Sequence, residues 1–128
     1  MTKEYTPVSI SELASTDKPN VEIQGVVLSA SPLPINGRGY LGVIRGTEVD
    51  PLAFFRGTDD LGNSREMALT LLLASAQGGL TITLRGVVDR TNYPYEHTWD
   101  SQNFERGNQP TLCVEEIVLN NLRYSTER

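Results

Sequence analysis

The feature that most constrains the fold of this sequence is a run of residues that alternate between apolar and polar. In LTITLRGVVD, residues 80–89, every second residue from Leu80 to Gly86 is apolar or glycine, and the residues between them are two threonines and Arg85. Successive side chains of a β-strand point to opposite faces of the sheet. The pattern therefore predicts a strand with one buried face.

Three more segments predict the strands before it. NVEIQGVVLSA, residues 20–30, alternates with the same period of two. GYLGVIRG from residue 39 and PLAFFRG from residue 51 are the next two predicted strands, joined by the polar turn TEVD. Ahead of all three, SISELAS predicts a helix of one to two turns that begins at Ser9 or Ser11, where a hydroxyl can cap it.

A longer helix is predicted between the third and fourth strands. Asn63 and Glu66 have the spacing of a capping box, and the residues that follow are strong helix formers. Gly78 and Gly79 provide an end signal. The helix predicted over residues 64–77 is apolar on most sides, so we expect it to close an opening of the core rather than lie on a wet surface.

The last predicted strand, TLCVEEIVLN at residues 111–120, contains two adjacent acids. Under strict alternation, the apolar pair before the acids and the apolar pair after them would lie on opposite faces. One extra residue restores the register, so we predict a β-bulge at Glu115 and Glu116 that directs both acids outward and returns Ile117 to the core. The alternative, a strand buried on both faces with one acid paired inside, is disfavoured because an unpaired buried carboxylate is costly.

The order of these elements, with Gly25 inside the first strand, resembles the OB-fold (oligonucleotide/oligosaccharide-binding fold). The resemblance covers residues 20–120 and rests on VEIQGVV as a first strand and on LTITLRGVV followed by LCVEEIVL as a closing pair. It implies a mainly β chain: a small five-stranded Greek-key barrel with one helix between strands 3 and 4 and a short N-terminal helix. We expect residues 1–128 to form one domain, with flanks at 1–19 and 121–128; another small β-barrel or an α+β roll is the structural alternative.

The resemblance also implies where a ligand would bind. OB-folds bind ligands on the face of strands 2 and 3, between the loop that joins strands 1 and 2 and the loop that joins strands 4 and 5. The second of these loops, residues 91–109, is long and holds four of the nine aromatic residues of the chain. The candidate ligand-binding residues are Arg38, Tyr40, Arg45, Arg56, Arg85, Tyr93, Tyr95, Trp99 and Phe104.

The aromatic loop has two interpretations of similar weight. Its rings could stack on nucleic-acid bases, each worth about 1 to 3 kcal/mol. They could equally pack the loop onto the barrel as a small apolar cluster. Glu96, Asp100 and Glu105 outnumber Arg106, so the loop is net negative and would repel phosphates unless arginines lie on the adjoining face.

Charge limits the classes of partner. The net charge of −5 opposes simple polyanion binding, which depends on basic side chains. Residues 36–90, however, contain six arginines and six acidic residues, so this section is neutral and the excess negative charge lies in the flanks. Arginine suits bidentate and stacked contacts, although surface ion pairs explain the same residues equally well.

Catalytic chemistry finds little support, so we expect no enzyme activity, no catalytic residues, no metal and no cofactor. His97 is the only histidine, and no spacing suggests a nucleophile with its base. Asp59 and Asp60 fit a polar turn before a helix better than a metal site. Cys113 is the only cysteine, and no secretory signal or stretch of about 18 apolar residues is visible, so we expect a cytoplasmic protein that does not cross a membrane.

These observations favour a non-enzymatic module that binds single-stranded nucleic acid on the strand 2–3 face and the 91–109 loop. A protein-interaction or self-assembling domain of a larger complex, including a homo-oligomer, is the alternative, because tyrosine, tryptophan and arginine are enriched in interface hot spots. Oligosaccharide binding ranks third. The sequence specifies neither a sequence preference nor an oligomeric state.

Overall fold

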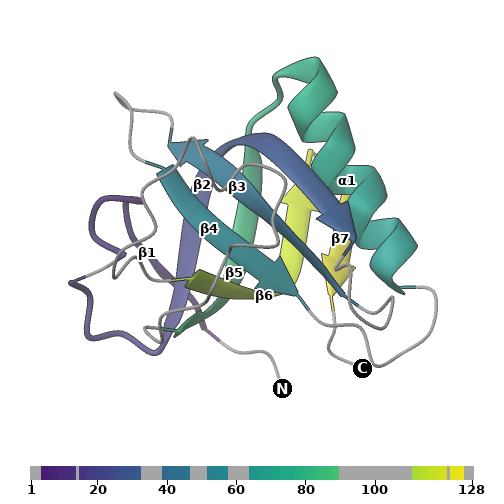
Figure 1. Ribbon diagram of the computed structural model, residues 1–128. Helices are drawn as coiled ribbons and strands as arrows, with labels where there is room; N and C mark the ends of the chain where they lie inside the picture. The colour runs from purple at the N-terminus through teal and green to yellow at the C-terminus, as the bar shows by residue number, and fades with distance from the viewer. Residues whose placement is uncertain are drawn as a thin grey trace.

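The computed structural model describes residues 4–13, 15–32, 39–46, 52–57, 64–89, 111–120 and 122–125. Seven strands and one helix are assigned within these residues (Figure 1). In chain order they are β1 (Thr6–Pro7), β2 (Asn20–Pro32), β3 (Tyr40–Gly46), β4 (Leu52–Gly57), α1 (Ser64–Gly78), β5 (Ile82–Asp89), β6 (Thr111–Leu119) and β7 (Leu122–Ser125). Among the described residues, no helix is long and apolar enough to cross a membrane.

Five of the strands close into a barrel. β2 pairs with β3, β3 with β4, β4 with β6, β6 with β5, and β5 returns to β2. All these pairs are antiparallel except β4 with β6. The predicted five-stranded barrel is confirmed. The helix was predicted between strands 3 and 4, and it lies between β4 and β5. The numbers differ by one because the short strand β1, which pairs with β2 in parallel, precedes the first barrel strand.

Barrel closure depends on one residue of β2. Gly25 pairs with Ile82 of β5 on one side and with Gly46 of β3 on the other, so the strand changes partner at this point. A Cβ atom at Gly25 would collide with the backbone carbonyl oxygen of Arg45. Glycine is therefore needed here for close approach of the backbones.

The predicted bulge in β6 is also present. Arg85 of β5 pairs with Glu116 and the next residue of β5 pairs with Val114, so Glu115 is the extra residue. Val114 is 4% exposed and Ile117 is fully buried, which places both on the core side. Both acids point away from the core, as predicted. Glu116 is nevertheless only 4% exposed, because the side chains of Arg85 and Arg123 cover it.

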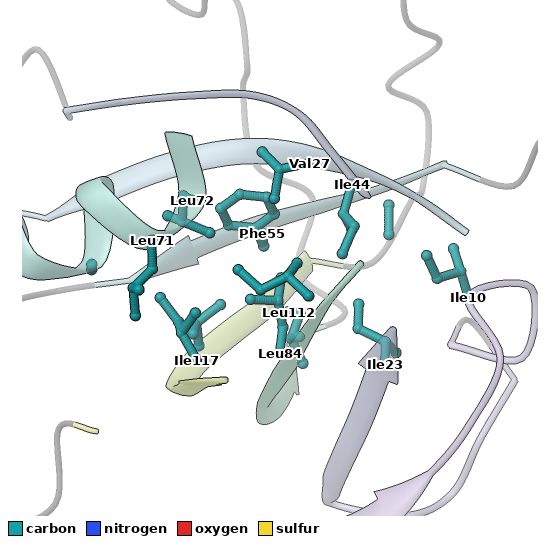
Figure 2. Packing of buried hydrophobic residues seen from close by; sticks show 14 of the residues in the cluster. Ile10, Ile23, Val27, Ile44, Phe55, Leu71, Leu72, Leu84, Leu112 and Ile117 are labelled. Carbon is teal, nitrogen blue, oxygen red and sulfur yellow. The ribbon is translucent and has the colours of Figure 1, made fainter. Parts of the chain in front are cut away.

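The helix closes one end of the barrel, as predicted. α1 packs against β2 and also meets β6 and β7. Figure 2 shows Leu71 and Leu72 of α1 lying beside the ring of Phe55, with Leu112 below it. Helix and strand are also joined by a polar contact, because the buried Ser75 hydroxyl accepts a hydrogen bond from the Val27 amide at 3.2 Å.

The helix ends in a glycine cap. Gly79 has a φ of +65°, and the Leu80 amide donates to the Ser75 carbonyl oxygen at 3.1 Å, which is the 6→1 bond of a Schellman motif. The cap changes the start of the next strand. Leu80, which the alternation placed on the buried face, precedes β5 and is 41% exposed.

No helix is assigned in residues 4–13 or 15–19, so the short helix expected at Ser9 or Ser11 is not found among the described residues. Ser9 and Glu12 do bond reciprocally, amide to side chain, at 3.1 and 3.2 Å, as in a capping box. The described residues there form hydrogen-bonded turns only, because one capped turn is too short to propagate before the chain enters β2.

We expect Gly25→Ala to destabilise the protein by about 1 to 3 kcal/mol, because the added methyl group must displace the Arg45 carbonyl or open the β2–β3 pairing. The measurement is urea-induced unfolding. Gly78→Ala is the matched control: a Cβ there meets only the flexible Leu80 side chain, and alanine favours the helix. Equal losses of stability in the two variants would contradict the conclusion that close backbone approach requires glycine at position 25.

Candidate functional site

The face of β3 and β4 that points away from the barrel core is the candidate ligand surface. The register pairs Leu41 with Arg56, Val43 with Phe54 and Arg45 with Leu52 across the two strands. The residues between them face inward: Tyr40, Ile44, Ala53 and Phe55 belong to the barrel core. We call this surface the β3–β4 outer face; it consists of Leu41, Val43, Arg45, Leu52, Phe54 and Arg56.

The charges on this face are positive. Arg45 is exposed and Arg56 is half-buried, and they lie on neighbouring strands at opposite ends of the face. Four residues of strand separate their register positions, which corresponds to about 14 Å. The described residues of β3 and β4 include no aspartate or glutamate. The described part of this face thus carries only positive side chains, in a chain with a net charge of −5.

The centre of the face is apolar and covered. Leu41, Val43 and Phe54 are 8%, 1% and 7% exposed, although none of them belongs to the barrel core. The neighbouring phenylalanines divide as their parity predicts, with Phe55 in the core and Phe54 on the outer face. Because the Phe54 ring is buried, the accessible features of this face are its arginines and Leu52, which is 36% exposed.

Tyr40 was predicted to face a ligand, but the structure places it in the barrel core. Its ring is 3% exposed and belongs to the barrel core, where it meets the ring of Phe55 edge to face at a centroid distance of 6.4 Å. The physical reason is the parity of β3, which turns Tyr40 inward with Ile44 and leaves Leu41 and Arg45 on the other side. The Tyr40 ring is therefore not available to a ligand on the outer face.

Arg85 lies on a different wall of the barrel. β5 pairs with β2 and β6, not with β3 or β4. The guanidinium of Arg85 contacts Glu22 of β2 at 2.7 Å and also contacts Glu116 of β6. Arg123 of β7 contacts the other oxygen of Glu116 at 2.5 Å. The structure therefore brings Arg45 and Arg56 together on one face but places Arg85 in an ion-pair row.

This ion-pair row shifts the pKa of its members. Burial alone would raise the pKa of Glu116, but hydrogen bonds from Arg85 and Arg123 outweigh it, so the pKa lies below the ordinary carboxyl value. The hydrogen bond to Glu22, with a smaller contribution from Glu116, raises the pKa of Arg85 despite partial burial. Both groups are therefore fully charged at neutral pH, and much of the positive field of Arg85 is cancelled by its two partners.

Sequence reasoning missed the partners in this row. Glu22 and Arg85 are both polar positions of alternating strands, so their shared orientation was visible, but their pairing depends on a register between residues more than 60 positions apart. Of the other candidates, Arg38, Tyr93, Tyr95, Trp99 and Phe104 lie outside the described residues. Within the described part of the chain, no group of three or more histidine, cysteine, aspartate or glutamate residues could hold a metal ion.

We expect Glu116→Gln to lower stability at neutral pH by about 1 to 3 kcal/mol, because the arginines lose a charged partner. The deficit should shrink as the solution is acidified. The folded pKa of Glu116 is depressed, so its stabilisation is present above the unfolded value near 4.5 and is lost as the pH falls through the folded value. Urea unfolding from neutral to acidic pH measures this, with Glu4→Gln as an exposed control. A stability deficit of Glu116→Gln that stays constant at every pH would contradict a depressed pKa of Glu116 in the folded state.

Comparisons with known proteins bear on the fold. No protein-family model and no curated protein match the sequence. A solved structure named as an aspartyl-tRNA synthetase, from Leishmania major Friedlin, is similar with a TM-score of 0.59 and 18% identity. The match covers 93% of this chain but only 21% of that chain. A small single-stranded DNA binding protein from Mycoplasma pneumoniae matches with a TM-score of 0.49 and 13% identity, over 82% of this chain and 96% of that chain. The first likeness shows a shared fold, and with the strand order described above the barrel of this chain is an OB-fold.

Proposed function

We propose that this protein is a non-enzymatic binding module that binds single-stranded nucleic acid on the β3–β4 outer face and the 91–109 loop. The observation that carries the proposal is the pair of arginines on that face. Arg45 and Arg56 are the only charged residues among the described positions of β3 and β4, and both are positive. The described strands of the face that OB-folds use for ligands thus carry only positive charge, in a chain that is acidic as a whole.

The spacing of the arginines suits a phosphate backbone. Two arginines whose register positions are about 14 Å apart can contact phosphates that are not adjacent in the strand. Phosphate contacts of this kind position a strand without reading its sequence. We therefore expect weak sequence preference from this face.

The similar fold of known proteins supports the proposal in a general way. One solved structure with this fold is named for an enzyme that acts on a tRNA, although this chain spans 21% of that chain. The OB-fold as a class uses this face and its adjoining loops for oligonucleotides. The loop of residues 91–109 would supply stacking rings, which the β3–β4 outer face lacks because Phe54 is buried.

A second candidate function, protein binding, is favoured by a different surface. No charged residue occurs between positions 67 and 81. On this stretch Met67, Leu73 and Leu80 are 60%, 39% and 41% exposed. Interfaces are depleted of charge at their centres and enriched in methionine, so α1 and the residues that follow it suit a protein partner.

The arginines are tested by titrating a labelled single-stranded oligonucleotide of about 15 thymidines at several salt concentrations. Affinity should fall as salt rises, with a slope of log K against log salt near −1.4 for two phosphate contacts. Arg45→Ala and Arg56→Ala should each weaken binding at low salt and reduce the slope by about 0.7.

Arg85→Gln is the matched control, because it removes the same charge from the wall formed by β2, β5 and β6. Its binding and salt slope should stay close to those of the unmodified protein, once circular dichroism shows that it is folded. Absence of binding at low salt would reject the nucleic-acid proposal and favour the protein interface. An Arg85→Gln effect as large as that of Arg45→Ala would mean that total charge, not the outer face, governs binding.

The loop part of the proposal is tested by Trp99→Ala. If the ring stacks on a base, affinity should fall by about 1 to 3 kcal/mol with little change in the salt slope, because stacking releases no counterions. Fluorescence of Trp99, the only tryptophan, should also be quenched when the oligonucleotide is added. Unchanged affinity together with lower stability would indicate that the ring packs onto the barrel instead.

A further inference from the structure

The two short strands that flank the barrel cover strand edges that the barrel strands leave open. β3 pairs with β2 only from Gly25 onward, and β1 pairs with β2 before that point, at Val21 and Glu22. β4 pairs with β6 only up to Cys113, and β7 pairs with β6 from Glu116 onward. Each flanking strand thus continues the sheet where a barrel strand stops.

The flanking strand β1 is tied to the bulge of β6. The hydroxyl of Tyr5, which immediately precedes β1, donates a hydrogen bond to Glu115 Oε1 at 2.9 Å. The Val8 amide, just after β1, donates to the Glu22 carbonyl oxygen at 3.0 Å. Glu115 is the extra residue of the bulge and has no register partner on β5, so its side chain is placed to reach a residue from another element.

The flanking strand β7 is tied to the adjacent acid. Arg123 donates to Glu116 Oε2 at 2.5 Å, while Arg85 holds the other oxygen of the same carboxylate. The side chain of Glu116 is 5% exposed and that of Arg123 is 56% exposed. The carboxylate therefore stays paired within the barrel through Arg85 even when Arg123 is absent.

We propose that the bulge acts as a clasp with two separate halves: Glu115 holds β1 and Glu116 holds β7, so each flanking strand can open without the other and without unfolding of the barrel. The two contacts use different residues, different oxygen atoms and strands from opposite ends of the described chain. Among the described residues, four register pairs join β7 to β6 and two join β1 to β2. Short segments of this kind open at a lower free energy than the core strands.

Amide hydrogen exchange at neutral pH on the full chain tests the clasp. Arg123→Met removes the guanidinium but keeps much of the aliphatic stem, and it should speed exchange in Leu122–Ser125 by about 5- to 30-fold. Exchange of the Val8 amide should not change in this variant. Tyr5→Phe removes only the hydroxyl and should give the reverse result, with faster exchange at Val8 and none of the change in β7.

The two variants control for each other, and Arg45→Met controls for the loss of an arginine elsewhere. The double variant should show both local changes, while the amides of β5 keep the rate of the unmodified protein. The proposal is overturned if either variant speeds exchange in both flanking strands, because the halves would then be coupled. It is also overturned if β5 accelerates equally, since the effect would then be global unfolding, or if neither flanking strand changes.

Discussion

The architecture depends on a change of partner within a single strand. β2 pairs with β5 along its first half and with β3 along its second, and Gly25 takes part in both pairings. Once β2 has left β5, its backbone requires another partner, and the Val27 amide finds one in the Ser75 hydroxyl of α1. The helix therefore closes the barrel end at the place where the strand separates from its first neighbour. This arrangement leaves the outer face of β3 and β4 uncovered by α1.

The arginines of the chain show how the same residue type serves two purposes. Arg85 lies between two carboxylates and joins β5 to β2 and β6, so its charge contributes to the barrel wall. Arg45 and Arg56 lie on the β3–β4 outer face, where the described residues of the two strands include no acid. The net charge of a chain therefore says little about the potential of one face, because the positive and negative side chains are distributed unevenly over the surface.

Much of the fold could be predicted from periodicity. The alternation in residues 80–89 and the failure of alternation in residues 111–120 indicated a strand and a bulge, and both are present. β1 and β7 were not predicted, because two- and four-residue strands are too short to show a period. Tyr40 was misplaced since all residues from Tyr40 to Ile44 are buried, and such a run does not indicate which side faces the core. The pairing of Arg85 depended on register, which composition does not encode.

The flanking strands have a consequence for how the molecule behaves among its own copies. An open strand edge is a row of unpaired amides and carbonyls that can template pairing with another chain. β1 and β7 occupy the two edges at which β3 and β4 stop, so the barrel exposes little extended backbone there. Within the described residues β7 is four residues long and contains Arg123, and short, charged strands resist sheet extension. If Glu115 and Glu116 hold these strands in place, as proposed above, then the same two acids also limit edge-to-edge pairing between copies of the protein.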